Sequence, residues 1–419
     1  MKLEIKRKSR MLDFEIIVRR LRTITGCFLF FYAVTHLINH SLGLISLEVM
    51  ELGRSVFLKF WRNQIIFYAL YGALFIHFLL GIYAIGRRRS FLLTRKEWIR
   101  NITAALIPFF LASHLSITLF GSRFLGLNDS YAFMILSTYL FDPVGYIGLS
   151  GFLSQEWLDR LNQITADFVE ISSGLSYETG PGKDKRFDLE PSHQPGAPRI
   201  RRLNSPVDHH QEYWDFASEG PFVEIAEDLL GPDVKFHHSK LNFKWGDGGE
   251  EVKWHQDIQF WPHTNYEVLT LGVYLDDVDP TMAPMGIIPG SHNGPLFDLY
   301  DESDTWTGNI SENDLTLLEL DSAEYLSGPA GTVTVHNCRC VHGSAPNLSS
   351  RSRPLFLCAY SAAHALPITD LTRGGKYSET IVRGKAARWA KFDSRPVLLP
   401  PDWSNTRHKS IFEHQQNEN

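Results

Sequence analysis

Cysteine is scarce in this chain. Its 419 residues include only four, and no two of them form a Cys-x-x-Cys pair; they are Cys27, Cys338, Cys340 and Cys358. Disulfide-bonded domains and cysteine-based zinc sites need paired cysteines at suitable spacing. The sequence therefore argues against a disulfide framework and against a structural zinc site, and a reducing compartment fits best.

Other signals are absent as well. No basic patch with interleaved aromatic residues occurs, so we do not expect nucleic acid as a partner. No glycine-rich phosphate loop indicates nucleotide binding. The formal net charge is −6, although the N-terminus itself is basic. No small-residue cleavage site follows the first apolar run, which we therefore interpret as a retained anchor rather than a signal peptide.

Long apolar runs are present, and they are confined to the first third of the chain. Three of them reach about 20 residues, the length that a helix needs to cross a bilayer. They are Ile24–Leu42, Gln64–Ile85 and Ile102–Phe120. The stretch Ser46–Trp61 between the first two has amphipathic helical spacing. The sequence predicts a helical membrane anchor over residues 1–142, with about three transmembrane helices.

Basic residues suggest an orientation for this anchor. Arginines precede the first run, and a cluster of Arg and Lys from Arg87 to Arg100 separates the second from the third. By the positive-inside rule, both regions are cytoplasmic. Three spans would place the following domain outside the cytoplasm, unless the short apolar segment Tyr131–Phe141 also crosses or re-enters. We expect a multi-pass protein, of a bacterial inner membrane, whose C-terminal domain faces the cytoplasm.

Histidines inside the apolar runs are unusual, because an ionisable group is costly in a bilayer. They are His36, His40, His77 and His114. Neutral histidines on facing helices can be axial ligands of haem b; the alternative is hydrogen bonding between helices. The Thr35–Gly43 segment (T-H-x-x-N-H-x-x-G), with its neighbouring motifs, resembles a bacterial membrane module distantly similar to succinate dehydrogenase cytochrome b anchors. This resemblance covers about residues 15–135.

The chain becomes polar and rich in Trp, Gly and Pro from about Gly145. We expect a helix capped by Ser154, a loop-rich stretch over Ser172–Pro206 and a second helix over Phe222–Leu230. Short strand-like runs follow, separated by turn residues; they are Val234–His238, Lys240–Lys244, Val252–His255, Val268–Leu275, Thr332–His336 and Leu355–Tyr360. This pattern predicts a double-stranded β-helix (jelly roll) with flanking helices over residues 143–400, and a polar tail over residues 401–419.

One strand-like run carries a metal-binding pattern. His255 and Asp257 are two residues apart, so both side chains lie on the same face of a strand. His342, at the end of a distant strand-like run, would complete a triad of two imidazoles and one carboxylate. Such a triad leaves iron positions open for a 2-oxo acid and dioxygen. His336 is an alternative to His342, and His210 with Glu212 is an alternative ligand pair.

A cation follows the third ligand. Arg353 enters the next strand, from which its planar guanidinium could reach a carboxylate that extends from the iron. Arg351 is the alternative. The adjacent His237 and His238 are interpreted as residues of the sheet in preference to ligands. Asn242, Lys244 and Trp254 are candidates to face the pocket.

Four ordered motifs carry a resemblance to a known family. Trp254-His-Gln-Asp, Val273-Tyr-Leu-Asp-Asp-Val, Gly286-Ile-Ile-Pro-Gly-Ser-His and His342-Gly-Ser-Ala-Pro-Asn together resemble the phytanoyl-CoA dioxygenase family. The resemblance implies a jelly roll, iron(II), 2-oxoglutarate and hydroxylation of a C–H bond. It also implies that His255, Asp257 and His342 hold the metal, and that Arg353 and Lys240 contact the 2-oxoglutarate.

The expected function is that of a membrane-tethered dioxygenase, dependent on iron(II) and 2-oxoglutarate, that hydroxylates a small-molecule or lipid substrate. One alternative is a non-catalytic membrane sensor of a ligand or redox state, with a haem-binding anchor. Another is a zinc or manganese hydrolase that uses the same ligands, although Arg353 has no evident role there.

Overall fold

The computed structural model describes residues 2–87, 94–96, 98–99, 102, 106, 111, 114, 141–175, 186–369, 375–402 and 411–416. The chain divides into two compact units, and the boundary between them falls between residues 125 and 133.

The N-terminal unit is helical. Its helices are α1 (Lys2–Ser41), α2 (Leu47–Trp61) and α3 (Gln64–Gly86). The amphipathic α2 begins as predicted, because the Ser46 side chain accepts a hydrogen bond from the Val49 amide and so caps the helix.

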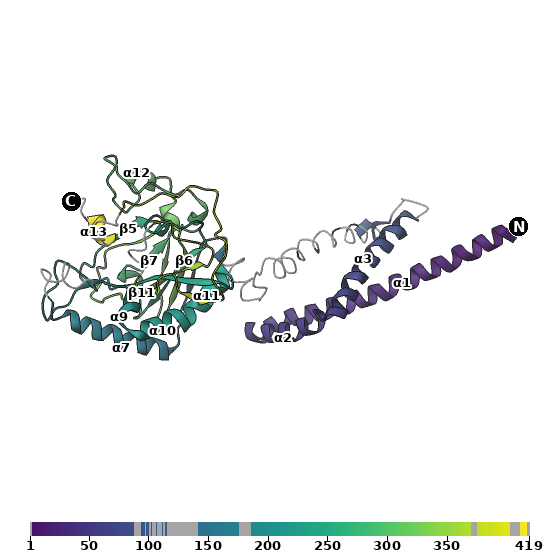
Figure 1. Ribbon diagram of the computed structural model, residues 1–419, viewed down its shortest axis with the longest axis horizontal. Helices are drawn as coiled ribbons and strands as arrows, with labels where there is room; N and C mark the ends of the chain where they lie inside the picture. The colour runs from purple at the N-terminus through teal and green to yellow at the C-terminus, as the bar shows by residue number, and fades with distance from the viewer. Residues whose placement is uncertain are drawn as a thin grey trace. The chain divides into compact units, whose positions relative to one another are not determined.

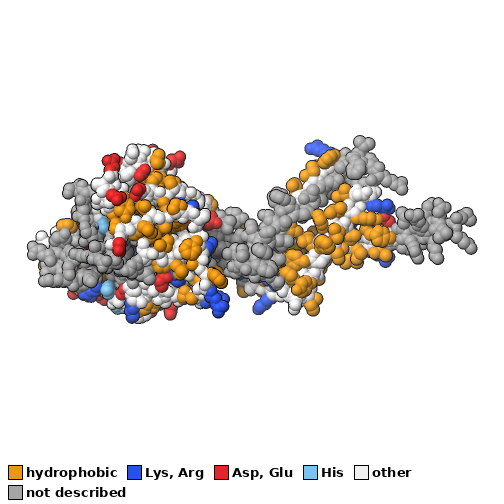
Figure 2. Space-filling model, turned by 45° about the horizontal axis from the view of Figure 1, so that its top comes forward, with side chains coloured by type: hydrophobic (Ala, Val, Ile, Leu, Met, Phe, Trp, Pro, Cys, Tyr) orange, Lys and Arg blue, Asp and Glu red, His pale blue; other side chains and the backbone are white. Residues whose placement is uncertain are grey.

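Two stretches of this unit, Phe14–Leu44 and Gln64–Gly86, are long and apolar enough to cross a membrane, by length and composition. Many of their large apolar side chains are exposed, and Figure 2 shows how densely these cover the helices. The predicted run Ile102–Phe120 and the segment Tyr131–Phe141 lie almost entirely outside the described residues.

The C-terminal unit is built on two antiparallel sheets, which form a jelly-roll core as predicted. In the described part, the larger sheet has the order β1-β9-β6-β11-β4-β3-β2, with β12 also paired to β4, and the smaller has the order β5-β10-β7-β8. The strands are β1 (Tyr146–Leu149), β2 (Phe187–Leu189), β3 (Ile200–Asn204), β4 (Val234–Asn242), β5 (Val252–His255), β6 (Val268–Tyr274), β7 (Met285–Ile287), β8 (Glu324–Leu326), β9 (Val333–Asn337), β10 (His342–Ser344), β11 (Leu355–Ala362) and β12 (Ile381–Arg383).

Helices cover the outer face of the larger sheet. They are α7 (Gln155–Ser172), α9 (Pro206–His209), α10 (Gln211–Glu219) and α11 (Pro221–Leu230), and α7, α9 and α10 lie together along one side of the domain (Figure 1). Ser154 caps α7 as predicted, and α11 ends at Gly231, whose φ of 95° suits glycine.

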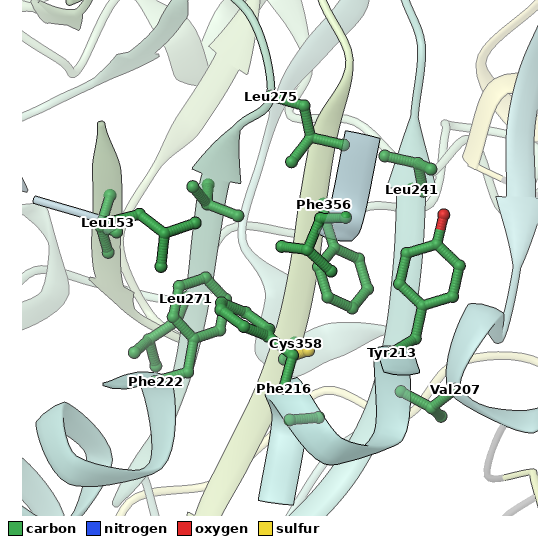
Figure 3. Packing of buried hydrophobic residues seen from close by; sticks show 14 of the residues in the cluster. Leu153, Val207, Tyr213, Phe216, Phe222, Leu241, Leu271, Leu275, Phe356 and Cys358 are labelled. Carbon is green, nitrogen blue, oxygen red and sulfur yellow. The ribbon is translucent and has the colours of Figure 1, made fainter. Parts of the chain in front are cut away.

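The main hydrophobic core fills the space between these helices and the sheet. Phe216 packs on Phe222 and on Phe356 of β11, and Tyr213 also packs on the Phe356 ring (Figure 3). Burial of each such ring contributes about 1.5–3 kcal/mol. This core holds the helices against one face of the larger sheet, and the opposite face of the sheet lines the interior of the barrel.

The prediction of a loop-rich stretch over Ser172–Pro206 was wrong for its second half, which contains β2 and β3. These strands are short and carry charged residues, which the pattern of the sequence does not mark as buried. Arg201 pairs with Asp188 at 2.6 Å, and both side chains are buried. The charges are therefore matched within the sheet instead of being solvated.

The runs Val234–His238 and Lys240–Lys244 are not two strands but mostly one, β4, with a β-bulge. Tyr360 of β11 pairs with Phe236 and Ala359 pairs with His238, so His237 is an extra residue. Phe236 faces the helices, where it packs on Trp214. His237 and His238 both turn to the barrel side, and their Nδ1 atoms are 2.6 Å apart.

The segment expected as a polar tail contains α13 (Ile411–Gln416), which packs against β5. Phe412 is buried, and the Gln415 side chain accepts a hydrogen bond from the Lys253 amide at 2.8 Å. The same side chain donates to the Gly308 carbonyl at 2.9 Å. These contacts attach the end of the chain to the strand that carries His255.

Candidate metal centre

The two predicted histidine ligands meet across the smaller sheet. His255 ends β5, His342 begins β10, and the two residues are direct partners in the antiparallel ladder. Asp257 follows in a 3-10 turn, η4 (Asp257–Gln259). One ligand atom from each of the three residues lies within 4.8 Å of the others, and all three residues are buried. The structure therefore brings together the triad that the sequence predicted.

Hydrogen bonds fix the orientation of both imidazoles. His255 Nδ1 lies 2.9 Å from the Lys253 carbonyl, and His342 Nδ1 lies 3.0 Å from the Cys340 carbonyl. A carbonyl oxygen only accepts, so each Nδ1 carries the proton and each Nε2 keeps a lone pair. Burial lowers the pKa of His255 to about 4, and it lowers the pKa of His342 well below its usual range. Both rings are neutral near pH 7, as metal ligation requires.

Asp257 is held by its neighbours as an anion. Thr270 donates to its Oδ2 at 2.8 Å, and His336 Nε2 lies 3.4 Å from the same oxygen. The Lys240 ammonium is 3.8 Å from Oδ1. Burial alone would raise the pKa of this carboxyl, but Lys240 first, then His336 and His342, bring the pKa well below its usual range. Thr270, which sequence reasoning missed, could have been recognised only from the pairing of β6 with its neighbours.

The alternatives to these ligands have other contacts. His336 lies beside the centre, with its ring centroid 4.4 Å from that of His342, but its Nε2 faces Asp257 and it does not belong to the group of three ligand atoms. His210 caps α10, and Glu212 pairs with Arg160. Neither His210 nor Glu212 joins the centre.

Arg353 lies just before β11, and its side chain is buried. Its amide donates to the Phe243 and Lys244 carbonyls at 3.0 Å, which fixes the backbone here. Its Nε and Nη1 atoms have no hydrogen-bond partner among the described residues. Arg351, the alternative, is instead exposed and pairs with Asp279 at 3.0 Å. A buried guanidinium with open donors is suited to an anionic ligand.

Three other residues were expected to face the pocket; Trp254 packs, partly buried, against the hydrophobic cluster that contains Ile258 and Phe260. Lys244 is buried and donates to the Ser344 and Ala345 carbonyls; burial, and then the charge of Arg353, lowers its pKa well below the usual range. Asn242 accepts a hydrogen bond from Arg202 at 2.8 Å. Asn242 and Lys244 thus have structural partners of their own.

The histidines of the helical unit do not converge on one point. The Nε2 atoms of His36 and His40 lie 3.1 Å apart, and the ring of His114 is 6.1 Å from that of His36. The Nδ1 atom of His77 contacts the Thr25 hydroxyl at 3.0 Å instead. Thr25 is about 16 Å from His36 along α1, from the helical rise of 1.5 Å per residue. The haem interpretation gains no support from this arrangement.

Known proteins resemble the C-terminal unit. A family model described as phytanoyl-CoA dioxygenase (PhyH) matches residues 141–355. The protein named "Probable alpha-ketoglutarate-dependent hypophosphite dioxygenase" of Stutzerimonas stutzeri is 31% identical over 275 residues, which are 65% of this chain and 93% of that protein. L-proline trans-4-hydroxylase of Streptomyces griseoviridis is 28% identical over 190 residues, 41% of this chain and 71% of that protein.

A relative with a solved structure is also similar. Ectoine dioxygenase of Sphingopyxis alaskensis is 28% identical over 238 residues, 53% of this chain and 74% of that protein. The structure of EctD from S. alaskensis with 2-oxoglutarate and 5-hydroxyectoine superposes with a TM-score of 0.46 and 23% identity, over 59% of this chain and 85% of that one. The family model spans just over half of the chain. The chain is therefore a dioxygenase that belongs to the phytanoyl-CoA dioxygenase family.

Proposed function

We propose that this dioxygenase depends on iron(II) and 2-oxoglutarate, hydroxylates a small polar molecule, and is tethered to a membrane by its N-terminal helices. The observation that carries the proposal is the buried triad of His255, Asp257 and His342, with both Nε2 lone pairs available to one ion. Two imidazoles and one carboxylate are the donor set of non-haem iron(II) oxygenases, so these residues fit the metal.

Arg353 is the proposed partner of the 2-oxoglutarate carboxylate that is not bound to iron. Its open donors match a planar carboxylate, which Arg can bind through two parallel hydrogen bonds. Lys240, which adjoins Asp257, is proposed as a second contact of the oxo acid. Iron(II) with 2-oxoglutarate and dioxygen supplies the oxidising power for C–H hydroxylation. The side chains bind and orient the reactants, and none of them need act as a nucleophile.

The proposed substrate class follows from the relatives and from the walls of the centre. The names of the relatives specify hypophosphite, L-proline and ectoine, all of them small polar molecules. Around the triad, the closest groups include Lys240, Thr270 and His336, which are polar. A lipid tail would need an apolar wall instead.

The membrane tether is proposed from the two long apolar stretches, Phe14–Leu44 and Gln64–Gly86. Their exposed apolar side chains would be solvated poorly by water and well by lipid. Arg19, Arg20 and Arg22 lie near the N-terminal end of the first stretch, which favours a cytoplasmic N-terminus. We propose that the dioxygenase domain also faces the cytoplasm, where 2-oxoglutarate is available.

The test uses the full chain in detergent, under anaerobic conditions, with iron(II). Addition of 2-oxoglutarate should produce the weak visible charge-transfer absorption of an iron(II)–2-oxo acid chelate. The Arg353→Ala variant should need about 10–100-fold more 2-oxoglutarate for the same absorption, because it loses charge-assisted hydrogen bonds.

Arg351→Ala is the matched control, because Arg351 is an exposed guanidinium close by in sequence, paired with Asp279. This variant should titrate like the wild type. An absence of the absorption in wild-type protein that holds iron would contradict the proposed cosubstrate. Equal titrations of the two variants would contradict only the assignment of Arg353.

A further inference from the structure

A second group of potential metal ligands lies in the dioxygenase domain, apart from the triad. It consists of His237, His263 and Glu379, whose ligand atoms all lie within 4.8 Å of one another. His237 comes from the bulge of β4, His263 from the loop after η4, and Glu379 from the turn before β12. Both histidines are buried, and Glu379 is partly buried.

Two ligand atoms in this group lack a partner. His263 Nδ1 lies 2.7 Å from the Trp261 carbonyl, so it carries the ring proton and Nε2 keeps the lone pair. That Nε2 is buried, with no hydrogen bond to any described residue, and the same is true of Glu379 Oε1. A buried polar atom without a hydrogen bond destabilises the folded state. A cation between the two atoms would satisfy both.

The backbone holds Glu379 in place. Its amide donates to the Phe236 carbonyl at 2.9 Å, and the Phe236 amide donates to the Thr380 carbonyl at 2.9 Å. Glu379 has a φ of 60°, a conformation that glycine adopts with less strain. The turn thus holds the Glu379 carboxylate beside the two histidines at a cost in backbone strain.

We propose that His237, His263 and Glu379 bind a divalent transition-metal ion, zinc before others, at a site separate from the triad. Two imidazoles and one carboxylate form a zinc donor set, and the open fourth position would take water. Along β4, His237 is three residues from Lys240, which adjoins Asp257; the rise of a strand puts these two residues about 10 Å apart. The site contains no cysteine, and the scarcity of cysteine therefore does not exclude it.

The proposed role of the ion is structural. It would join β4, the loop that follows Asp257, and the segment that leads into β12, three parts of the chain that are distant in sequence. Burial lowers the pKa of His263 to about 4, so the ring is neutral and able to ligate at neutral pH. This inference does not depend on the proposed iron chemistry.

Lys235 provides the competing explanation. Its ammonium forms an ion pair with Glu379 Oε2, and its side chain is buried. If the group exists only to bury this ion pair, no metal is needed. If it binds a metal, the lysine charge opposes the ion, and its removal should strengthen metal binding.

The experiment uses the full chain with His255→Ala and His342→Ala, which removes both imidazoles of the triad. After chelator treatment and loading with zinc ion alone, bound zinc per chain is measured by mass spectrometry following gel filtration. The proposal predicts one bound zinc per chain in this double variant. A triple variant that also carries His263→Ala should bind none. Glu379→Gln, which keeps the shape of the side chain, should weaken zinc binding at least 10-fold, and Lys235→Met should strengthen it.

Cobalt(II) supplies an independent measurement. In the same background it should give the visible absorption of a four-coordinate site with nitrogen and oxygen ligands, absent in the His263→Ala variant. Less than a tenth of an equivalent of zinc, or zinc that His263→Ala and Glu379→Gln leave unchanged, would overturn the proposal. Because the triad is already disabled, neither result bears on 2-oxoglutarate turnover, which is measured in the otherwise native chain.

Discussion

His342 and His255 are direct partners across the β10–β5 ladder, and the centroids of their rings are 4.2 Å apart. The distance between these ligands is therefore set by the register of two short strands. A change of register by one residue would turn one imidazole to the opposite face. The geometry of the metal centre therefore also depends on residues without polar side chains, which keep the two strands in register.

Gly343 is the first such residue. A Cβ at this position would lie 2.9 Å from the Val252 carbonyl oxygen, so β10 could not keep its place beside β5. Gly343→Ala should weaken iron(II) binding at least 10-fold and lower the free energy of unfolding. Gly174→Ala is the control, because its Cβ would meet its nearest neighbour at an ordinary 3.6 Å. Anaerobic titration with iron(II) measures the affinity. If Gly343→Ala binds iron(II) as tightly as the wild type, the pairing of β10 with β5 does not require glycine at this position.

The two histidines should be equivalent in their importance. His255→Ala and His342→Ala should each abolish stoichiometric iron(II) binding and turnover of 2-oxoglutarate, and the double variant should be no worse, because a centre that has lost one ligand is already lost. His364→Gln is the control, since His364 pairs with Glu267 instead. Iron per chain and succinate formation are the measurements. Iron retained by either single variant would contradict the assignment.

Thr270 should matter only through Asp257, to which it donates a hydrogen bond at 2.8 Å. Groups that orient a metal ligand typically contribute 10–100-fold to metal affinity, so we expect a loss of about that size in Thr270→Val. Thr334→Val is a close match, because Thr334 is also buried in the larger sheet but its hydroxyl has no partner among the described residues. Thr334→Val should be neutral or stabilising. Equal iron affinities of the two variants would contradict the assignment of Thr270 as a residue that orients Asp257.

Acid should destabilise the metal-free protein over a defined range. Burial lowers the pKa of His255 and of His263 to about 4, below the value of about 6.5 in an unfolded chain. Between these pH values the unfolded state binds more protons, so the free energy of unfolding should fall as the pH falls from about 6.5 to about 4. His263→Gln should show a shallower fall.

Urea unfolding followed by tryptophan fluorescence, with chelator present throughout, measures this dependence. A free energy of unfolding that is constant between pH 6.5 and 4 would mean that the two rings are solvated or protonated in the folded protein. Below about pH 4 these two histidines should lower the free energy of unfolding little further, because both rings are then protonated in the folded and in the unfolded state.

The sequence predicted the pair His255 and Asp257 because its signal is local. His255 and Asp257 are two residues apart, and β5 was predicted with its observed bounds, Val252–His255. The residues that orient the triad could not be found in this way. Thr270 and His336 reach Asp257 only because β6 pairs with β9, a relationship between segments far apart in the chain.

Short elements were the other failure. β7, β8, β10 and β12 have three residues each, too few to show alternation. β2 and β3 carry charges that are neutralised inside the protein, so their polarity misled the prediction of a loop. In the same way, His237 and His238 were interpreted as ordinary residues of the sheet, because the extra residue in β4 is visible only from the pairing with β11.

That extra residue reverses the parity of β4. Before the bulge, the odd-numbered Lys235 lies on the barrel side; after it, the even-numbered Lys240 does. Deletion of one histidine would restore simple alternation, with Lys235, the remaining histidine and Lys240 on the barrel side and Phe236 still toward the helices. A chain shorter by one residue here would therefore lose one imidazole from the inner wall of the barrel, while every other side chain of β4 kept its face.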